Sequence, residues 1–409
     1  MVEAPQVEAP VFEAPWLTIL GLGEDGPDGL APASLRALRE AEIVIGPPRH
    51  LSLLPALEAE LVEWPAPFAD GLPLLEGFRG RCVVALVSGD PFWFGAGSAI
   101  ARRLAPHEWR ALPGPSTFSL AASRLGYSLE TTLCLGLHAA PLSRLRPHLA
   151  PGVRAVLLLR DGAAVAELAR FLVAEGFGES RITVLEALGG PRERITRARA
   201  DALAQRDFAH PVAVAAEFAG DGRVVPCASG LDDALFDSDG QITRRPVRAL
   251  ALSALAPRPG EMLWDIGGGS GSIAVEWCLA HSLTQAISIE SRPDRAARIR
   301  VNADRFGLER LRVVEGQAPA ALDGLPVPQA VFIGGGLSEA LLTDLRGRLP
   351  AGVRLVAHAV TLESEARLIA WSERLGGDLL RVELSEAAAL GARRGWSPAR
   401  PIVQWRVTL

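Results

Sequence analysis

The feature that most constrains the fold is a repeated alternation of short apolar runs with longer helical stretches. It begins at Trp16 and predicts strands joined by helices, which is an α/β fold with parallel strands. The strands expected in the first half are Leu17–Leu20, Ile43–Ile45, Val83–Val87, Val156–Leu159, Ile182–Leu185 and Val212–Ala215. The helices expected there are Pro32–Ala41, Ser98–Leu104, Thr117–Leu125, Ala164–Glu175 and Arg197–Arg206.

The alternation stops after Cys227. Residues 228–241 are rich in glycine and aspartate, which predicts a linker between two domains, 16–227 and 242–409. The length of 409 residues is also that of two or three domains. The last two strands expected, on either side of an arginine- and glycine-rich loop at 391–395, could pair as an antiparallel edge. The strands expected in the second half are Met262–Ile266, Ala286–Ile289, Arg312–Val314, Ala330–Ile333, Arg354–Ala357, Leu380–Leu384 and Ile402–Val407.

The composition excludes several kinds of chemistry. The chain has no lysine, so Schiff-base chemistry and a Walker-type phosphate lysine are excluded. The net charge of -5 argues against a nucleic-acid partner. The four cysteines are widely separated and form no CxxC pair, and no HExxH motif occurs, so no metal site is expected. Arginine remains available for binding carboxylates.

The N-terminus repeats Glu-Ala-Pro three times within residues 1–15, which predicts a flexible tail outside the fold. It lacks the basic start and apolar stretch of a secretory signal. No apolar run approaches the ~18 residues that a membrane span needs. We therefore expect a soluble, cytoplasmic protein with no membrane partner.

The clearest motif in the second half is Met262-Leu-Trp-Asp-Ile-Gly-Gly-Gly-Ser-Gly-Ser272, an expected strand followed by a glycine-rich turn and a helix. Such a turn lets the backbone approach a ligand closely. Asp265 at the strand end suits a cationic sulfonium amino acid better than a pyrophosphate. Glu290, at the end of the next strand, can accept hydrogen bonds from both ribose hydroxyls. Glu315-Gly316-Gln317-Ala318 follows the third strand and could flank an adenine.

This half, from about residue 241 to 407, resembles the class I S-adenosylmethionine-dependent methyltransferases, which have a Rossmann-like fold. Thr243-Arg244-Arg245 and the triplet Gly334-Gly-Gly336 further resemble the decarboxylating methyltransferases of the cobalamin pathway. The substrate contacts expected in this half are Arg244, Arg245 and Arg248. The cofactor contacts expected from the motif and the resemblance are Thr243, Asp265, Gly267, Gly268, Gly269, Ser270, Gly271, Glu290, Gly316, Gln317 and Ala318.

The first half carries glycine- and proline-rich turns after expected strands. They are Leu20-Gly-Leu-Gly-Glu-Asp-Gly26, Val87-Ser-Gly-Asp-Pro-Phe-Trp-Phe-Gly95 and Leu112-Pro-Gly-Pro-Ser-Thr117. Turns of this kind gather at the carboxyl ends of strands, where open α/β sheets bind ligands. Ser116 and Thr117 could equally be simple helix caps.

These turns resemble the tetrapyrrole methylase family, also called class III S-adenosylmethionine methyltransferases, over about residues 16–227. Ser88-Gly-Asp-Pro91 is the most specific mark, although the first loop has Gly23-Glu-Asp-Gly26 where the family usually has Gly-Pro-Gly. The resemblance implies a class III fold, and His138 as a substrate contact. The cofactor contacts that it implies are Gly23, Gly89, Asp90, Pro91, Ser116 and Thr117.

Together the halves resemble the fused methyltransferases of the aerobic cobalamin pathway. That resemblance implies two S-adenosylmethionine sites, one in each half, and a tetrapyrrole substrate, a reduced precorrin-6. The N-terminal half would methylate C5, and the C-terminal half would methylate C15 and decarboxylate the C12 acetate, giving precorrin-8x. By analogy we expect a homo-oligomer. Asp90, Glu276 and His358 could move protons, but the sequence favours none of them.

Three other functions stay open on the sequence alone. An NAD-linked two-domain reductase is disfavoured because the third glycine of the turn comes one residue early and Asp265 precedes it. A non-catalytic tetrapyrrole-binding scaffold is the second. A methyltransferase acting on RNA or protein is the third, and the Ser88–Pro91 loop argues against it.

Overall fold

The computed structural model describes residues 15–203 and 207–409, so most of the expected tail, residues 1–14, lies outside the described residues. Two compact units are found. The first comprises the chain up to Ala140 and Ala150–Arg223, and the second comprises Pro141–Leu149 and Val224–Leu409. No helix in the described part of the chain is long and apolar enough to cross a membrane.

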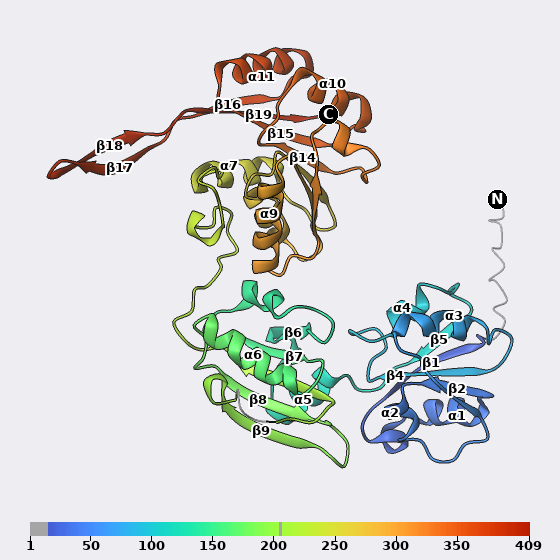
Figure 1. The fold of residues 1–409 in the computed structure, drawn as a ribbon. Helices are drawn as coiled ribbons and strands as arrows, with labels where there is room; N and C mark the ends of the chain where they lie inside the picture. The colour runs from blue at the N-terminus through green and yellow to red at the C-terminus, as the bar shows by residue number, and fades with distance from the viewer. Residues whose placement is uncertain (1–14, 204–206) are drawn as a thin grey trace, which may run out of the picture. The chain divides into compact units, whose positions relative to one another are not determined.

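The first unit begins with a parallel sheet in the order β3-β2-β4-β1-β5 (Figure 1). Apolar runs form its central strands because both faces are covered. Helix α1 packs on one face, and α3 and α4 pack on the other. The strands are β1 (Leu17–Leu22), β2 (Ile43–Gly46), β3 (Glu60–Glu63), β4 (Val83–Ser88) and β5 (Trp109–Leu112). The helices are α1 (Pro32–Glu40), α2 (Pro48–Leu51), α3 (Gly71–Glu76) and α4 (Gly97–Ala101).

The second sheet of this unit has the order β6-β7-β10-β8-β9, and only β6 and β7 pair in parallel. The expectation of parallel strands is therefore wrong for most of this sheet. The helix expected at Arg197–Arg206 is wrong where the structure describes it, because β9 occupies its start and a 3-10 turn follows at Ala200–Ala202; residues 204–206 lie outside the described residues. The elements are α5 (Thr117–Leu125), β6 (Leu133–Gly136), β7 (Arg154–Leu158), α6 (Ala163–Ala174), β8 (Arg181–Glu186), β9 (Arg194–Arg199) and β10 (Val212–Glu217).

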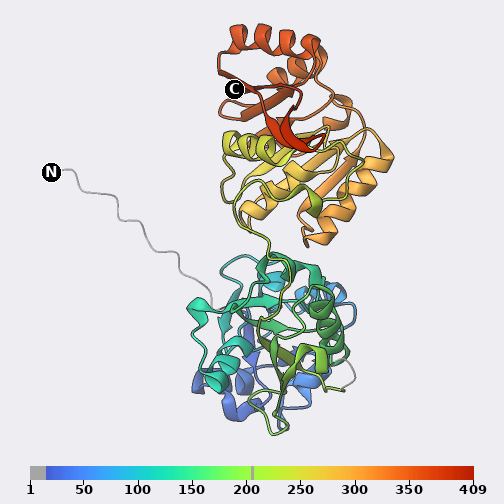
Figure 2. The same ribbon diagram turned by 90° about the vertical axis from the view of Figure 1, so that its left-hand side faces the viewer.

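The second unit is built on one sheet in the order β13-β12-β11-β14-β15-β19-β16. Helices α7, α8 and α9 cover one face, and α10 and α11 cover the other (Figures 1 and 2). The parallel strands are β11 (Met262–Ile266), β12 (Gln285–Glu290), β13 (Leu311–Glu315), β14 (Ala330–Ile333) and β15 (Arg354–Ala359). The helices are α7 (Arg245–Leu255), α8 (Ser272–Ala280), α9 (Pro293–Arg305), α10 (Glu339–Arg348) and α11 (Leu362–Leu375).

The antiparallel edge of this sheet is confirmed, since β19 (Ile402–Thr408) pairs with β15 and with β16 (Asp378–Val382). The segment between β16 and β19 is a two-stranded ribbon, β17 (Ser385–Leu390) and β18 (Arg393–Pro398), where only a loop was expected. Figure 1 shows this ribbon extending away from the sheet. The stretch 228–241, expected as a linker, contributes the buried Leu231 and Phe236 to the core beside α7 and α8.

Candidate functional site

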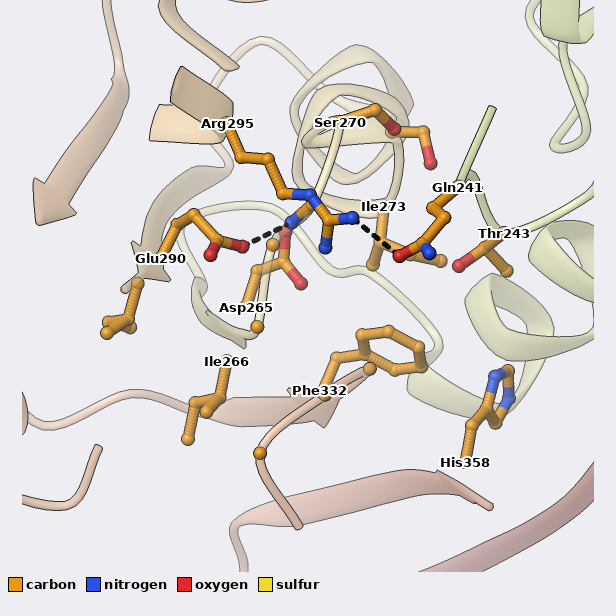
Figure 3. A pocket seen from close by; sticks show the side chains of 18 of the residues that line it. Gln241, Thr243, Asp265, Ile266, Ser270, Ile273, Glu290, Arg295, Phe332 and His358 are labelled. Carbon is orange, nitrogen blue, oxygen red and sulfur yellow. Dashed lines mark hydrogen bonds between the residues drawn. The ribbon is translucent and has the colours of Figure 1, made fainter. Parts of the chain in front are cut away.

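The second unit has a cavity of about 510 Å³ at the carboxyl ends of its parallel strands. This is where open α/β sheets bind ligands, and the size is ordinary for a small-molecule site. The lining comes from the segment before α7, the glycine turn after β11, and the residues that follow β12, β13, β14 and β15. Figure 3 shows the side chains that face this cavity.

The turn after β11 requires glycine at position 267. Gly267 has φ +71°, and a Cβ there would lie 2.7 Å from the backbone nitrogen and Cα of Gly335. Its N–H donates to the carbonyl oxygen of Ile289 (2.9 Å), which fastens the turn to the neighbouring strand. The chain then enters α8 at Ser272, so the helix N-terminus faces the cavity.

Two carboxylates mark the floor of this cavity. Asp265 is 1% exposed, and its Oδ2 accepts a hydrogen bond from Ser288 Oγ (3.1 Å). Burial raises the pKa of Asp265 to about 7, and the nearby Glu290 adds to the increase. Glu290 accepts from the backbone N–H groups of Gly269 (2.9 Å) and Arg292 (2.9 Å). These two carboxyl groups give the floor of the cavity an acidic character, which favours a ligand that places a cationic group there.

The cavity is bordered on another side by residues 241–244. The side-chain oxygen of Gln241 accepts from Arg295 Nη2 (2.5 Å), and Arg295 Nε also donates to Asp239 (2.9 Å). Thr243 and Arg244 follow on the same border, and Figure 3 shows Gln241 and Thr243 beside Ile273. These bonds tie the border to α9.

Arg248 does not line the cavity, contrary to the expectation of substrate contact. It is fully buried, and its guanidinium donates to Glu276 (2.5 Å), Asp233 (2.9 Å) and the carbonyl oxygen of Thr243 (2.5 Å). A buried charge needs such partners. Arg248 therefore holds the Thr243 border in place. Its partner Glu276 also accepts from two backbone N–H groups, at 230 and 231, and so is bound within the protein.

The structure brings most of the residues predicted in this half to one cavity. Gly271 and Arg245 do not line it; Gly271 caps α8, and Arg245 is exposed on α7. The predicted residues that line it are Thr243, Arg244, Asp265, Gly267, Gly268, Gly269, Ser270, Glu290, Gly316, Gln317 and Ala318. The lining residues that sequence analysis did not assign as contacts include Gln241, Ile273, Arg292, Arg295, Phe332, His358, Val360 and Ile402. Their positions just after parallel strands, or at helix starts, are the signal that could have found several of them.

The first unit has its own cavity, of about 430 Å³, lined from both of its sheets. On one side lie the turns after β1 and β4 and the start of α5. On the other side lie His138, Arg160, His210 and residues of β8 and β10. It is thus a second site, built entirely within the first unit.

The glycine-rich turns of this unit pass one another at contact distance. A Cβ at Gly21 would lie 1.8 Å from the carbonyl oxygen of Gly89 and 2.5 Å from the backbone nitrogen of Gly114. Gly114 N–H donates to that same carbonyl oxygen of Gly89 (3.1 Å). Glycine at position 21 therefore lets the three turns meet at the cavity.

A polar network borders this cavity. Glu24 is 8% exposed and forms ion pairs with Arg49 and with Arg192 (2.9 Å). Arg49 also donates to Ser88 Oγ (3.1 Å), which lies 3.2 Å from His50 Nε2. Burial, reinforced by Arg49, lowers the pKa of His50 to about 3. His50 is therefore neutral, and Arg49 is the cation that this network presents to the cavity.

Four of the residues predicted in the first half line this cavity, namely Gly23, Gly89, Thr117 and His138. Ser116 does not; it caps α5, and its Oγ accepts from Ser119 N–H (3.0 Å). Asp90 and the buried Pro91 are also outside the lining, and Asp90 accepts from Phe92 N–H (2.8 Å). The polar lining residues that sequence analysis did not assign as contacts are Glu24, Arg49, Ser88, Arg160 and His210.

Comparison with known proteins gives matches over both halves. The family model "Tetrapyrrole (Corrin/Porphyrin) Methylases" matches residues 17–204, and "Precorrin methyltransferase domain" matches residues 234–409. A precorrin-6Y C(5,15)-methyltransferase (decarboxylating) from Sinorhizobium sp is 52% identical over 404 residues, covering 98% of this chain and 98% of that protein.

Two proteins of Salmonella typhimurium match shorter parts. A cobalt-precorrin-6B C(15)-methyltransferase (decarboxylating) is 32% identical over 166 residues, covering 39% of this chain and 85% of that protein. A cobalt-precorrin-7 C(5)-methyltransferase is 29% identical over 182 residues, covering 44% of this chain and 88% of that protein. Each of these single-activity relatives thus matches less than half of the chain.

Proposed function

The chain belongs to the family of the precorrin-6Y C(5,15)-methyltransferases (decarboxylating), and we propose that each of its two cavities serves one of the two methylations. The enzyme methylates a precorrin at C5 and C15 in cobalamin biosynthesis and decarboxylates it. In this proposal the first unit methylates C5. The second unit methylates C15 and removes the carboxyl group of the C12 acetate, giving precorrin-8x. The observation that carries the proposal is that each unit has its own cavity lined by glycine-rich turns.

The methyl donor of this enzyme family is S-adenosylmethionine, whose sulfonium supplies a methyl group that a nucleophilic carbon can displace. We propose one donor site in each unit. In the second unit, the buried Asp265 fits the cationic amino-acid end, and Glu290 has oxygen lone pairs free for ribose hydroxyls. In the first unit, the meeting turns around Gly21 and Gly89 would bring backbone groups close to the donor.

The substrate is a tetrapyrrole with many carboxylates, and both cavities present arginine. Arg49 and Arg160 line the first, and Arg244, Arg292 and Arg295 line the second. Guanidinium groups bind carboxylates through two parallel hydrogen bonds, which fixes orientation as well as affinity. Because the substrate carbons are nucleophilic, the protein's main task is to hold them beside the donor.

Incubating the full chain with reduced precorrin-6 and S-adenosylmethionine tests this function. Mass spectrometry is expected to show two added methyl groups and the loss of one carbon dioxide. A scaffold without catalysis would return unchanged substrate, and a reductase would need a nicotinamide. Self-association, a cytoplasmic location and the lack of a nucleic-acid partner remain predictions from the sequence.

Binding of S-adenosylhomocysteine in the second unit is expected to release a proton below pH 7. The ammonium group of the ligand favours the ionised form of Asp265, so the pKa of about 7 falls on binding. A carboxyl that is protonated before binding and ionised afterwards gives up its proton. Affinity should therefore drop as the pH falls below 7, by up to about tenfold per pH unit.

Calorimetry at pH 6 in two buffers of different ionisation enthalpy measures this release. The matched control is Asp265→Asn, which has the same shape but no proton to lose. The wild-type protein should release more protons per bound S-adenosylhomocysteine than Asp265→Asn does. Equal proton counts in the two proteins would contradict the role given to Asp265.

Replacing Arg244 with alanine is expected to raise KM for the precorrin in the C15 reaction by about 10- to 150-fold, since one charge-assisted contact is worth roughly 1.5–3 kcal/mol. Arg244 lines the cavity, and its nearest carboxylate, Asp233, is 4.0 Å away. Arg245→Ala is the control, because Arg245 is exposed outside the cavity. Equal KM values for the two variants in steady-state assays would refute a substrate contact at Arg244.

A further inference from the structure

His358, near the end of β15, lies on the opposite side of the second cavity from Glu290. The strands run in the order β12-β11-β14-β15, and their register pairs Ile289 with Ile266, Ile266 with Ile333, and Ile333 with Ala357. Glu290 and His358 are the residues directly after Ile289 and Ala357. Three strand spacings, roughly 14 Å, therefore separate the backbones of Glu290 and His358. Figure 3 shows the two side chains on either side of Asp265. If Glu290 binds the ribose of the methyl donor, His358 lies on the side of the cavity that remains for the substrate.

The protonation of this imidazole is set by its surroundings. Nε2 lies 2.9 Å from Oε1 of Gln404, its register partner on β19. An amide oxygen can only accept, so Nε2 carries the hydrogen and Nδ1 is a free base in the neutral ring. Burial holds the pKa of His358 below its usual value, which keeps the ring neutral. Phe332 contacts the ring edge-on, with 4.9 Å between centroids, and limits its rotation.

The other ionisable groups described around this cavity are less suited to moving a proton near the substrate. Asp265 is bonded to Ser288 and lies two strand spacings from His358. Glu290 lies three spacings from His358 and accepts from two backbone N–H groups. The remaining ionisable lining residues described are arginines, which stay protonated. Glu276, a candidate from the sequence, is bonded to Arg248 outside the lining, and Asp90 belongs to the first unit.

The C15 reaction moves one proton within the substrate. When the acetate loses carbon dioxide, its C–C bond electrons enter the conjugated macrocycle, and the former acetate carbon must gain a proton to become a methyl group. C15 forms a bond to the donor methyl group as the C–S bond breaks, and C15 must lose its own proton. The sum of carboxylate, sulfonium and C–H gives two methyl groups, carbon dioxide and a thioether, with no proton left over.

We propose that His358 is the catalytic residue that accepts the C15 proton on Nδ1 and delivers it to the carbon that lost its carboxyl group. Gln404 is its positioning residue, because it holds the tautomer in which Nδ1 is free. This inference rests on the function proposed above, and specifically on the C15 reaction taking place in this cavity.

The test compares His358→Gln with His281→Gln in the full chain. Glutamine removes an exchangeable base in both variants, but His281 lies outside the cavity. Carbon dioxide release and C15 methylation by His358→Gln are expected to fall on the order of 100-fold or more, the usual share of acid–base catalysis. C5 methylation, assayed with the C15-methylated intermediate, and affinity for S-adenosylhomocysteine should match the wild type, and His281→Gln should keep all activities.

A His358→Gln rate within about tenfold of wild type would overturn the proposal. If that variant binds no S-adenosylhomocysteine in the second unit, Gln404→Leu is the deciding variant. It keeps the imidazole but removes the hydrogen bond that holds the ring in one tautomer. If Gln404→Leu methylated C15 at the wild-type rate, the assignment of His358 would be rejected. A wild-type enzyme that releases no carbon dioxide would instead contradict the proposed function itself, so the two failures are distinguishable.

Discussion

Gly267→Ala is expected to abolish C15 methylation and decarboxylation, while C5 methylation of the supplied C15-methylated intermediate continues. The added Cβ would lie 2.7 Å from two backbone atoms of Gly335, so the turn after β11 must move. That turn positions Asp265 and the start of α8, both of which face the cavity. A displacement of this kind in a donor site commonly costs 100-fold or more, and here we expect about 1000-fold in the C15 rate.

Gly324→Ala is the matched control for Gly267→Ala. Gly324 has nearly the same backbone conformation, φ +72°, but a Cβ there meets nothing within 4 Å, and the residue lies outside the cavity. It should cost only the conformational strain of about 1 kcal/mol in stability and leave both methylations intact. Mass spectrometry of the products separates the two activities. Normal C15 methylation by Gly267→Ala would contradict the cavity assignment.

Gly21→Ala is expected to have the opposite effect, abolishing C5 methylation and sparing the C15 reaction. Its Cβ would lie 1.8 Å from the carbonyl oxygen of Gly89, closer than any side chain can be accommodated without moving the backbone. The three turns that meet there would separate, and the first cavity would lose its shape. We expect a C5 rate at least about 1000-fold lower.

Gly80→Ala serves as the control for Gly21→Ala, because Gly80 belongs to the same unit and its Cβ would meet nothing within 4 Å. The products are again read by mass. If Gly21→Ala stops both methylations although the second unit still binds S-adenosylhomocysteine, the C15 reaction depends on prior C5 methylation. Unimpaired C5 methylation would contradict the assignment of the first cavity.

The parallel strands of the second unit could be predicted from the sequence because their apolar runs are buried on both faces. The second sheet of the first unit could not, since a run such as Val212–Ala215 is equally apolar in an antiparallel sheet. Arg197–Arg206 was expected to be a helix because arginine and alanine favour helices. In the structure β9 instead pairs with β8, which lies on the other side of a turn, and that pairing overrides the propensity.

The residues of the candidate sites also differ in whether the sequence could predict them. The glycine turns and Glu290 were predictable because each is encoded within a few consecutive residues. Arg248 was not, since its burial depends on Glu276 and Asp233, which are distant in sequence. His358 is one of three proton-transfer candidates between which the sequence does not choose, because its importance comes from Gln404 and Phe332 on neighbouring strands. Long-range pairings of this kind leave no local pattern.

The most direct test of two methyl-donor sites is a calorimetric titration of the full chain with S-adenosylhomocysteine. The account predicts two molecules bound per chain, and one per chain in either Gly21→Ala or Gly267→Ala. A wild-type stoichiometry of one, abolished by a single one of these substitutions, would contradict the claim that each unit holds its own donor.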